Sequence, residues 1–385
     1  MSVNLVKYNI NISLVEQIQN LLLPFNINFG KRVFIKSNLS ARPPEIKGEN
    51  TSLLFIDALV KYLINSKCSE IIVGHSSLIG TKEKSYPFEL LIKASGFYKL
   101  LNNKQVTLLD LDNVERQEIE INSFKYKIPK IIHQVDSYIN LGVLKTHMET
   151  TVSLSMKNQM GLLELFGRKD FHKKSLEKPI AYLSKMIKPK ISILEGIIGM
   201  EGNGPHDGTS KKANLIIASD NMLELDTLGC YLMGIDYENI EHIKEAKKIG
   251  VGNFINIETE NKYKDYIVKF KQAEKIISYG KKIKVYPTTS CSFCQQVLRT
   301  AGKKLKSNFK TAIIFLYKAY FSKKEIRIIM GTGKGLESFD SDDIIIPIGI
   351  CTKEWCEKRN LNGIYGCPPD INIVSELILN KIKGK

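Results

Sequence analysis

The segment SYINLGVLKTHMETTVSLSMKNQMGLL, residues 137–163, joins a β-strand pattern to a helix pattern. Its first part, SYINLGVLKTH, is typical of a strand and its exit, and we expect a helix to begin at Thr150 or Thr151. Side chains alternate along a strand, so Lys145 and His147 should point the same way. α/β proteins bind ligands where a strand ends and a helix begins, because the N–H groups of the first helical turn are available there. The segment therefore predicts an α/β fold with a polar site at this junction.

The predicted helix carries polar residues beside an apolar stripe. Val152, Met156 and Met160 recur every four residues and form the stripe, whereas Lys157 lies on a neighbouring face and is followed by Asn158. A lysine that extends to the surface and a hydrogen-bonded histidine at the protein's rim would give the same spacing. The spacing alone therefore leaves both a ligand site and a solvated rim open.

Strand and helix patterns alternate along the rest of residues 1–275. Strands are predicted at 32–37, 70–74, 106–111, 191–197 and 213–219. Helices are predicted at 51–64 and 87–96, and a further helix is capped by Asp220 and ends at Gly234. Strands separated by helices imply βαβ units, so the expected fold class is α/β with a largely parallel sheet and flanking helices.

The composition narrows the class of protein. The chain has 385 residues, of which 43% are hydrophobic, and a formal net charge of +16. This charge suits an acidic partner, but the lysines are spread along the chain without a long basic block, so a nucleic acid is not the partner we expect. No run approaches the ~18 apolar residues of a membrane helix, and the N-terminus lacks the layout of a signal peptide. We therefore expect a soluble, cytoplasmic protein with no membrane partner.

A glycine-rich segment, GMEGNGPHDG, follows the strand predicted at 191–197 and occupies residues 199–208. Its backbone could approach an anion closely, but it matches neither G-x-G-x-x-G nor the phosphate loop G-x-x-x-x-G-K-S/T. Glu201 and Asn203 make it richer in usable side chains than a plain turn needs, and a long turn is the alternative. Asp226, in an otherwise apolar helix, is expected to face outward rather than to serve the site as a buried acid.

Five of the seven cysteines fall in the last 95 residues, which favours a metal site over disulfides in a cytosolic chain. CSFC is a C-x₂-C string, a spacing that suits one zinc ion or one edge of an iron–sulfur cluster. The last of these cysteines is followed by proline, as in bacterial ferredoxin runs. The expected metal ligands are Cys291, Cys294, Cys351 and Cys367.

Cys356 either replaces Cys351 as a ligand or takes no part. Iron–sulfur is favoured over zinc, which would use the same four thiolates. A Lys-rich, less periodic stretch precedes the cysteines, and we place a boundary near residue 275. This divides the chain into an α/β domain at 1–275 and a cysteine-rich metal-binding part at 276–385.

These strings together resemble the uncharacterised family called domain of unknown function 362. The resemblance is carried, in family order, by VFIKSN (33–38), EIIVGHSS (70–77), NLGVLKTHMETTVSLSMKNQMGLL (140–163), LEGIIGMEGNGPHDG (194–208) and ASDNMLELDTLGCYLMG (218–234). The tail resembles the iron–sulfur end of some members, which implies a 4Fe–4S cluster. The family's architecture is distantly similar to that of nickel-pincer lactate racemases, but this chain has no convincing nickel-binding histidine set, so nickel is not expected. Ser37 and His75 depart from the usual proline and acidic residue.

The resemblance implies a fold and a site but no reaction. We expect an iron–sulfur enzyme, either an oxidoreductase or a lyase or isomerase, that acts on a small anionic substrate by redox or acid–base chemistry. Its expected catalytic residues are His147, Lys145 and Lys157, with His147 as the acid–base group. Its expected substrate-binding residues are Lys36, Asn38, Asn158, Glu201 and Asn203, all lining one pocket.

Two other functions stay open at this point. The first is a non-enzymatic electron carrier or maturation partner, in which the same cleft docks a redox partner protein. The second is a zinc-stabilised nucleic-acid-binding protein that uses the basic surface, with binding that weakens steeply as salt rises.

Overall fold

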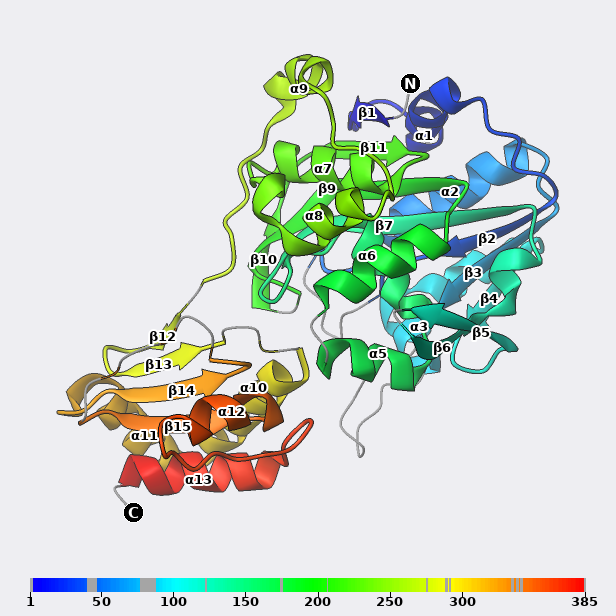
Figure 1. The fold of residues 1–385 in the computed structure, drawn as a ribbon. Helices are drawn as coiled ribbons and strands as arrows, with labels where there is room; N and C mark the ends of the chain where they lie inside the picture. The colour runs from blue at the N-terminus through cyan, green and yellow to red at the C-terminus, as the bar shows by residue number, and fades with distance from the viewer. Residues whose placement is uncertain are drawn as a thin grey trace. The chain divides into compact units, whose positions relative to one another are not determined.

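The computed structural model describes residues 3–39, 47–76, 88–121, 123–173, 176–205, 207–274, 276–287, 290, 292–333, 336, 339 and 342–383. These residues divide into two compact units, the first ending at Ala273 and the second beginning at Glu274 (Figure 1). Each unit contains its own β-sheet with helices packed against it. Among the described residues, no helix combines the length and the apolar character needed to cross a bilayer.

The first unit is built on a sheet of strand order β1-β11-β9-β7-β2-β3-β4. In that order the strands are β1 (Val3–Lys7), β11 (Leu215–Ser219), β9 (Ile191–Asn203), β7 (Ser137–His147), β2 (Arg32–Lys36), β3 (Glu70–His75) and β4 (Val106–Asp110). The strands from β9 to β4 are parallel to their neighbours, whereas β11 and β1 pair antiparallel. The fold is therefore α/β with a largely parallel central sheet and flanking helices, as the sequence predicted.

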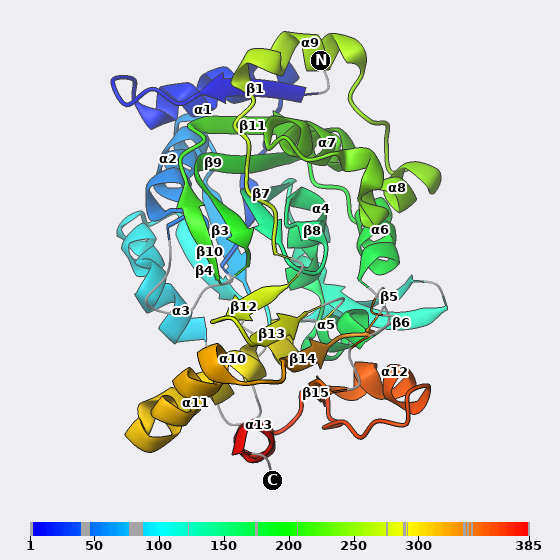
Figure 2. The same cartoon turned by 90° about the vertical axis from the view of Figure 1, so that its left-hand side faces the viewer.

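Helices cover both faces of this sheet (Figure 2). One face carries α1 (Leu14–Leu22), α2 (Leu53–Asn65) and α3 (Phe88–Ser95), and the other carries α6 (Glu177–Met186), α7 (Met222–Leu232) and α8 (Glu241–Lys248). The alternation along β2 separates the two cores: Val33 and Ile35 pack with α1 and α2, while Phe34 between them belongs to the opposite core. The second core also takes residues from α4 (Ser155–Asn158), α5 (Leu165–Lys173) and α9 (Ile257–Tyr263).

The helix expected to begin at Thr150 or Thr151 begins later, so that prediction is wrong. The strand β7 continues through His147, and a short strand, β8 (Thr151–Val152), turns back and pairs antiparallel with its end. Thr151 has a φ of 63°, in the left-handed region, which no helix continues. The helix α4 starts only at Ser155, where a buried carboxylate accepts hydrogen bonds from its first N–H groups.

The described residues of the glycine-rich segment 199–208 belong to the two paired strands of a β-hairpin and to the turn between them, rather than to one long turn. The strand β9 runs as far as Asn203 and returns as β10 (Asp207–Lys211), paired antiparallel with it. A Cβ atom at Gly204 would lie 2.1 Å from the carbonyl oxygen of Thr146, so glycine is required for this arm to lie against the end of β7. The segment thus extends the sheet beside the predicted site.

A separate antiparallel hairpin in the first unit, β5 (Arg116–Ile121) and β6 (Phe124–Pro129), follows β4.

The second unit has a sheet of strand order β12-β13-β14-β15, in which β12 pairs antiparallel and the other neighbouring strands are parallel. Its strands and helices are β12 (Ile277–Tyr279), β13 (Ile283–Tyr286), α10 (Ser292–Ser307), α11 (Phe309–Phe321), β14 (Ile326–Met330), β15 (Ile344–Ile348), α12 (Lys353–Glu357) and α13 (Ile371–Lys383).

Candidate functional site

Basic side chains gather where the parallel strands of the first unit end. Lys36 is the last residue of β2, and Lys145 and His147 close β7, its neighbour in the sheet. Parallel strands end at one edge of a sheet, so these residues meet there. Their exposed fractions are only 2%, 1% and 2%. The alternative of lysines on a solvated rim is therefore wrong, and we call Lys36, Lys145, His147 and Lys157 the basic cluster.

Lys145 is held by hydrogen bonds from the protein. Its Nζ donates to Asn38 Oδ1 and to the carbonyl oxygen of Glu49, each over 2.9 Å. Asn38 in turn donates to Asn158 Oδ1 over 3.0 Å. Asn158 donates to Asn140 Oδ1 over 2.8 Å. These asparagines orient Lys145 and join β2, β7 and α4, so their amides are engaged by the protein itself.

Lys157 and His147 form a close pair. The Nζ of Lys157 lies 2.6 Å from Nε2 of His147. On the other side of the ring, Nδ1 accepts hydrogen bonds from the backbone N–H groups of Glu149, over 3.0 Å, and Thr150, over 3.3 Å. Since Nδ1 is an acceptor, a neutral ring carries its proton on Nε2. That proton points at Lys157, which can accept it only as a neutral amine.

Burial also favours the neutral form of the lysines, because it lowers their pKa values. It lowers the pKa of Lys157 to about 8, although Glu149 and Glu177 partly oppose the shift. Burial also lowers the pKa of Lys145 to about 7, and the charge of Glu49 partly offsets this. These values place the amines where they exchange protons near neutral pH.

Lys36 is the least compensated member of the basic cluster. Its Nζ donates to the carbonyl oxygen of Ser37 over 2.6 Å, and no described carboxylate lies within ion-pair distance of it. Burial lowers its pKa to about 7, and the charges of Arg168 and Lys145 lower it further. A buried ammonium with this environment is favoured only when an anion joins it.

Asp226 of α7 positions the helix that carries Lys157. Its carboxylate accepts hydrogen bonds from Ser155 N–H over 2.8 Å, Ser155 Oγ over 2.5 Å and Met156 N–H over 3.0 Å. Burial raises its pKa to about 7, and these hydrogen bonds oppose the shift. The prediction that Asp226 faces outward is wrong, because α7 is buried along almost its whole length and has no outward face.

Glu201 and Asn203 lie on the hairpin arm. Glu201 Oε2 accepts a hydrogen bond from Lys271 N–H over 2.9 Å and lies 3.5 Å from Lys211 Nζ. Asn203 is the last residue of β9 and faces Asp207 across the hairpin.

Of the eight predicted site residues in this unit, the structure joins six through hydrogen bonds and charge interactions: Lys36, Asn38, Lys145, His147, Lys157 and Asn158. Glu201 instead serves the hairpin.

Three buried residues near the basic cluster were not predicted. His75 ends β3, Arg168 lies on α5, and His242 lies on α8. The charges of Lys36 and Arg168 lower the pKa of His75 in addition to burial, and Lys157 does the same for His242, whose pKa falls to about 3. Arg168 and His242 stand in helices rich in charged residues, α5 and α8, where a further titratable side chain gives no sign of burial in the sequence.

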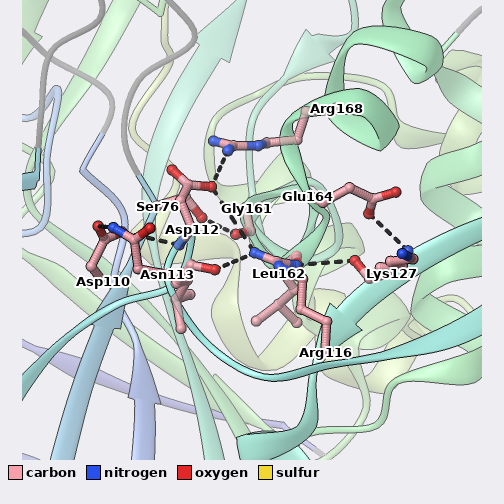
Figure 3. Close-up of polar contacts among 11 residues, drawn as sticks. Ser76, Asp110, Asp112, Asn113, Arg116, Lys127, Gly161, Leu162, Glu164 and Arg168 are labelled. Carbon is pink, nitrogen blue, oxygen red and sulfur yellow. Dashed lines mark hydrogen bonds and ion pairs between the residues drawn. The ribbon is translucent and has the colours of Figure 1, made fainter.

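Arg168 belongs to the polar network drawn in Figure 3. Its guanidinium donates to Asp112, just beyond β4. Arg116 donates to the carbonyl oxygen of Leu162 over 2.9 Å, and Ser76 donates to that of Gly161. The bonds from Ser76 and Arg116 fix the short 3₁₀ helix η4 (Gln159–Leu162), directly after Lys157 and Asn158, to the end of β3 and the start of β5, and the bond from Arg168 ties α5 to the residues after β4.

Three of the predicted cysteine ligands approach one turn of the second unit. Gly349 N–H donates to Ile364 O over 2.8 Å, and Ile350 N–H donates to Gly366 O over 3.0 Å. Cys351 follows Ile350 and Cys367 follows Gly366, so the two cysteines come directly after backbone segments that are hydrogen-bonded to each other. A Cβ atom at Gly349 would lie 2.9 Å from Sγ of Cys294. The fourth cysteine, Cys291, lies outside the described residues.

Cys356 has a different environment. It is fully buried against Tyr286, Ile329 and Trp355, and a Cβ atom at Gly363 would lie 3.4 Å from its Sγ. Within the part of the chain that the structure describes, no three side chains of His, Cys, Asp or Glu are grouped so as to hold a metal ion. The predicted metal set therefore stays a prediction.

Two known proteins and one protein family are similar to this chain. The thylakoid-associated protein sll1697 of Synechocystis is 24% identical over 253 residues, which is 62% of this chain and 76% of that protein. The lactate racemase apoprotein of Thermoanaerobacterium thermosaccharolyticum superposes with a TM-score of 0.38 and 14% identity, over 95% of this chain and 84% of that chain. The family described as domain of unknown function (DUF362) matches residues 33–231, more than half of this chain, and the chain belongs to that family.

Proposed function

We propose that this protein is an enzyme that binds a small anionic substrate at the basic cluster and transfers a proton to or from it. The observation that carries the proposal is the 2.6 Å contact between Lys157 Nζ and His147 Nε2, with Nδ1 already accepting two backbone hydrogen bonds. In this geometry Lys157 accepts the His147 proton only as a neutral amine, and its pKa of about 8 brings that form within reach near neutral pH, where a buried amine can act as a base.

The two residues divide the work. Lys157 takes a proton from the substrate and becomes an ammonium, which ends the hydrogen bond that it accepts from His147. The Nε2–H of His147 is then available to an oxygen atom of the substrate on which negative charge develops. Lys36 and Lys145 hold the anionic group, whose charge raises the pKa of both lysines and compensates for their burial.

A deuterium-exchange experiment tests this function. Small carboxylates and phosphates are screened for those that raise the melting temperature, and these ligands are then incubated with the protein in D₂O. We expect NMR to show that deuterium is incorporated into the ligand. Lys157→Met should abolish this exchange while the variant still binds the ligand. Lys61→Met, on the exposed face of α2, is the matched control. Exchange at the original rate in Lys157→Met would contradict the proposal.

We propose further that Cys291, Cys294, Cys351 and Cys367 bind a 4Fe–4S cluster, with zinc as the alternative metal. The approach of Cys294, Cys351 and Cys367 to Gly349 supports this set, and the aromatic surroundings of Cys356 argue against that residue. A cluster would supply electron transfer and make the chain an oxidoreductase, or a carrier for a redox partner protein, whereas the proton transfer alone suits a lyase or isomerase.

The matched pair Cys367→Ser and Cys356→Ser tests the metal set. After anaerobic purification, we expect the wild-type protein and Cys356→Ser to carry iron and acid-labile sulfide, and Cys367→Ser to lose both. Zinc without sulfide would select the alternative metal. Full retention of iron in Cys367→Ser would exclude the proposed ligand set.

A further inference from the structure

Two buried residues near Lys36 have no role in the proposed function: His75, at the end of β3, and Arg168, on α5. We propose that Lys36, His75 and Arg168 form an oxyanion subsite, which binds the carboxylate or phosphate group of the substrate. The inference rests on the proposed function, because it names the part of the substrate that this site holds. We call these three residues the oxyanion subsite.

His75 supplies the first argument. It is the last residue of β3 and is 5% exposed, and neither of its ring nitrogens has a hydrogen-bond partner among the described residues. The hydroxyl of Ser37, at the end of the neighbouring strand, is likewise fully buried and without a partner there. Buried polar groups in folded proteins are nearly always hydrogen-bonded, so two such groups at adjacent strand ends point to a bound molecule.

Lys36 supplies the second argument, through its position. A Cβ atom at Gly161 would lie 2.8 Å from Lys36 Nζ and 3.9 Å from Ser76 Oγ. The ammonium of Lys36 therefore lies beside Gly161 and close to Ser76, the residue that follows His75. The glycine leaves room for the ammonium, and the N–H bonds that the Ser37 carbonyl does not use remain for an anion.

Arg168 supplies the third argument, because its position is fixed. Asp112 accepts a hydrogen bond from its guanidinium, as Figure 3 shows. Two other acids interact with Arg168, but Asp110 accepts from Asn113 over 2.7 Å and Glu164 accepts from Lys127 N–H over 2.7 Å. Arg168 in turn acts on both Lys36 and His75.

The positive charges of Arg168 and Lys145 both act on Lys36, and Arg116 acts on Arg168 beside the acids Asp112, Asp110 and Glu164. An oxyanion bound there would stand next to Lys145, on the side that leads to Lys157. The substrate class that fits is a small acid whose transferable proton lies near its carboxylate or phosphate group.

Titration calorimetry at constant ionic strength tests the oxyanion subsite, with inorganic phosphate and acetate as separate probes. We expect the wild-type protein to bind at least one of them, and His75→Phe and Lys36→Gln to lose at least 10-fold in affinity. His242→Phe is the matched control, since His242 is also a fully buried histidine with two unpartnered ring nitrogens among the described residues. The control should bind the probe as the wild type does, and circular dichroism should show that each variant is folded.

The outcomes separate this inference from the proposed function. Preference for phosphate or for acetate assigns the chemistry of the substrate group. Unchanged affinity in folded His75→Phe and Lys36→Gln overturns the oxyanion subsite, even if Lys157-dependent deuterium exchange is found. Conversely, loss of probe binding in both variants without any such exchange in the wild type supports the oxyanion subsite and removes the proton-transfer proposal.

Discussion

The asparagines of the first unit and the side chains at the ends of β2 and β3 are similarly buried but differ in their hydrogen bonding. Asn158 is 5% exposed and both accepts and donates hydrogen bonds within the protein. His75 is also 5% exposed and has no partner at either nitrogen among the described residues. The first arrangement stabilises the fold at the site, whereas the second carries an energetic cost that a ligand can remove.

The largest loss of stability is expected at Asp226, whose carboxylate, like the asparagines, has hydrogen-bond partners within the protein. Asp226→Ala leaves the N–H groups of Ser155 and Met156 without their acceptor, so the free energy of unfolding should fall by on the order of 3 kcal/mol. Urea denaturation measures the change. The exposed neighbour Asp220→Ala serves as control and should change stability by less than about 0.5 kcal/mol. Equal effects of the two substitutions would show that Asp226 does not hold α4.

A gain in stability is expected when Lys36, at the end of β2, is replaced. Without any anion at pH 6, Lys36→Met removes a buried ammonium that no described carboxylate pairs with, and should raise the free energy of unfolding by on the order of 2 kcal/mol. The same substitution should remove the stabilisation that phosphate or acetate gives to the wild type. A destabilised Lys36→Met protein at pH 6 would contradict the comparison.

The advantage of Lys36→Met should shrink as pH rises. The folded-state pKa of Lys36 is lowered to about 7 from the ordinary 10.5, so between these values the unfolded chain binds more protons than the folded one. Stability of the wild type at this site therefore increases with pH across that window, and the charge penalty that the variant avoids disappears. Unfolding curves of both proteins at pH 6, 8 and 10 measure the difference, which would stay constant if Lys36 titrated normally.

The smallest effect is expected at Glu201, which the sequence placed in the site and the structure places on the hairpin arm. Glu201→Gln keeps an acceptor for Lys271 N–H but loses the charge facing Lys211, so stability should fall by less than about 1 kcal/mol. Probe binding should be unchanged in calorimetry. A 10-fold loss of affinity would return Glu201 to the binding site.

Much of the site followed from strand geometry alone. The alternation of side chains predicts that Lys145 and His147 share a side, and the common edge of parallel strands predicts that Lys36 joins them. Repeating apolar residues set the sheet and its helices in the same way. These features depend on local periodicity, which a single sequence displays.

The remaining features depend on contacts between distant segments. The helix after β7 starts at Ser155 because Asp226, on α7, accepts its first N–H groups, and nothing near Thr150 reveals this. His75 is marked in the sequence as a departure from the usual acidic residue, but its lack of hydrogen-bond partners among the described residues becomes visible only once the neighbouring strands are placed. The hairpin at 199–208 was hidden because its glycines, read as a loop, serve close packing against β7.

NMR titration of the lysine Cε signals tests the central claim most directly, with Lys36→Met, Lys145→Met and Lys157→Met used for assignment. The account predicts three signals in the ligand-free protein with pKa values of about 7, about 7 and about 8. It also predicts that a bound anion, phosphate or acetate, moves the signals of Lys36 and Lys145 to higher pKa. If all lysine signals titrate near 10.5 with or without the anion, the basic cluster is not a buried anion site.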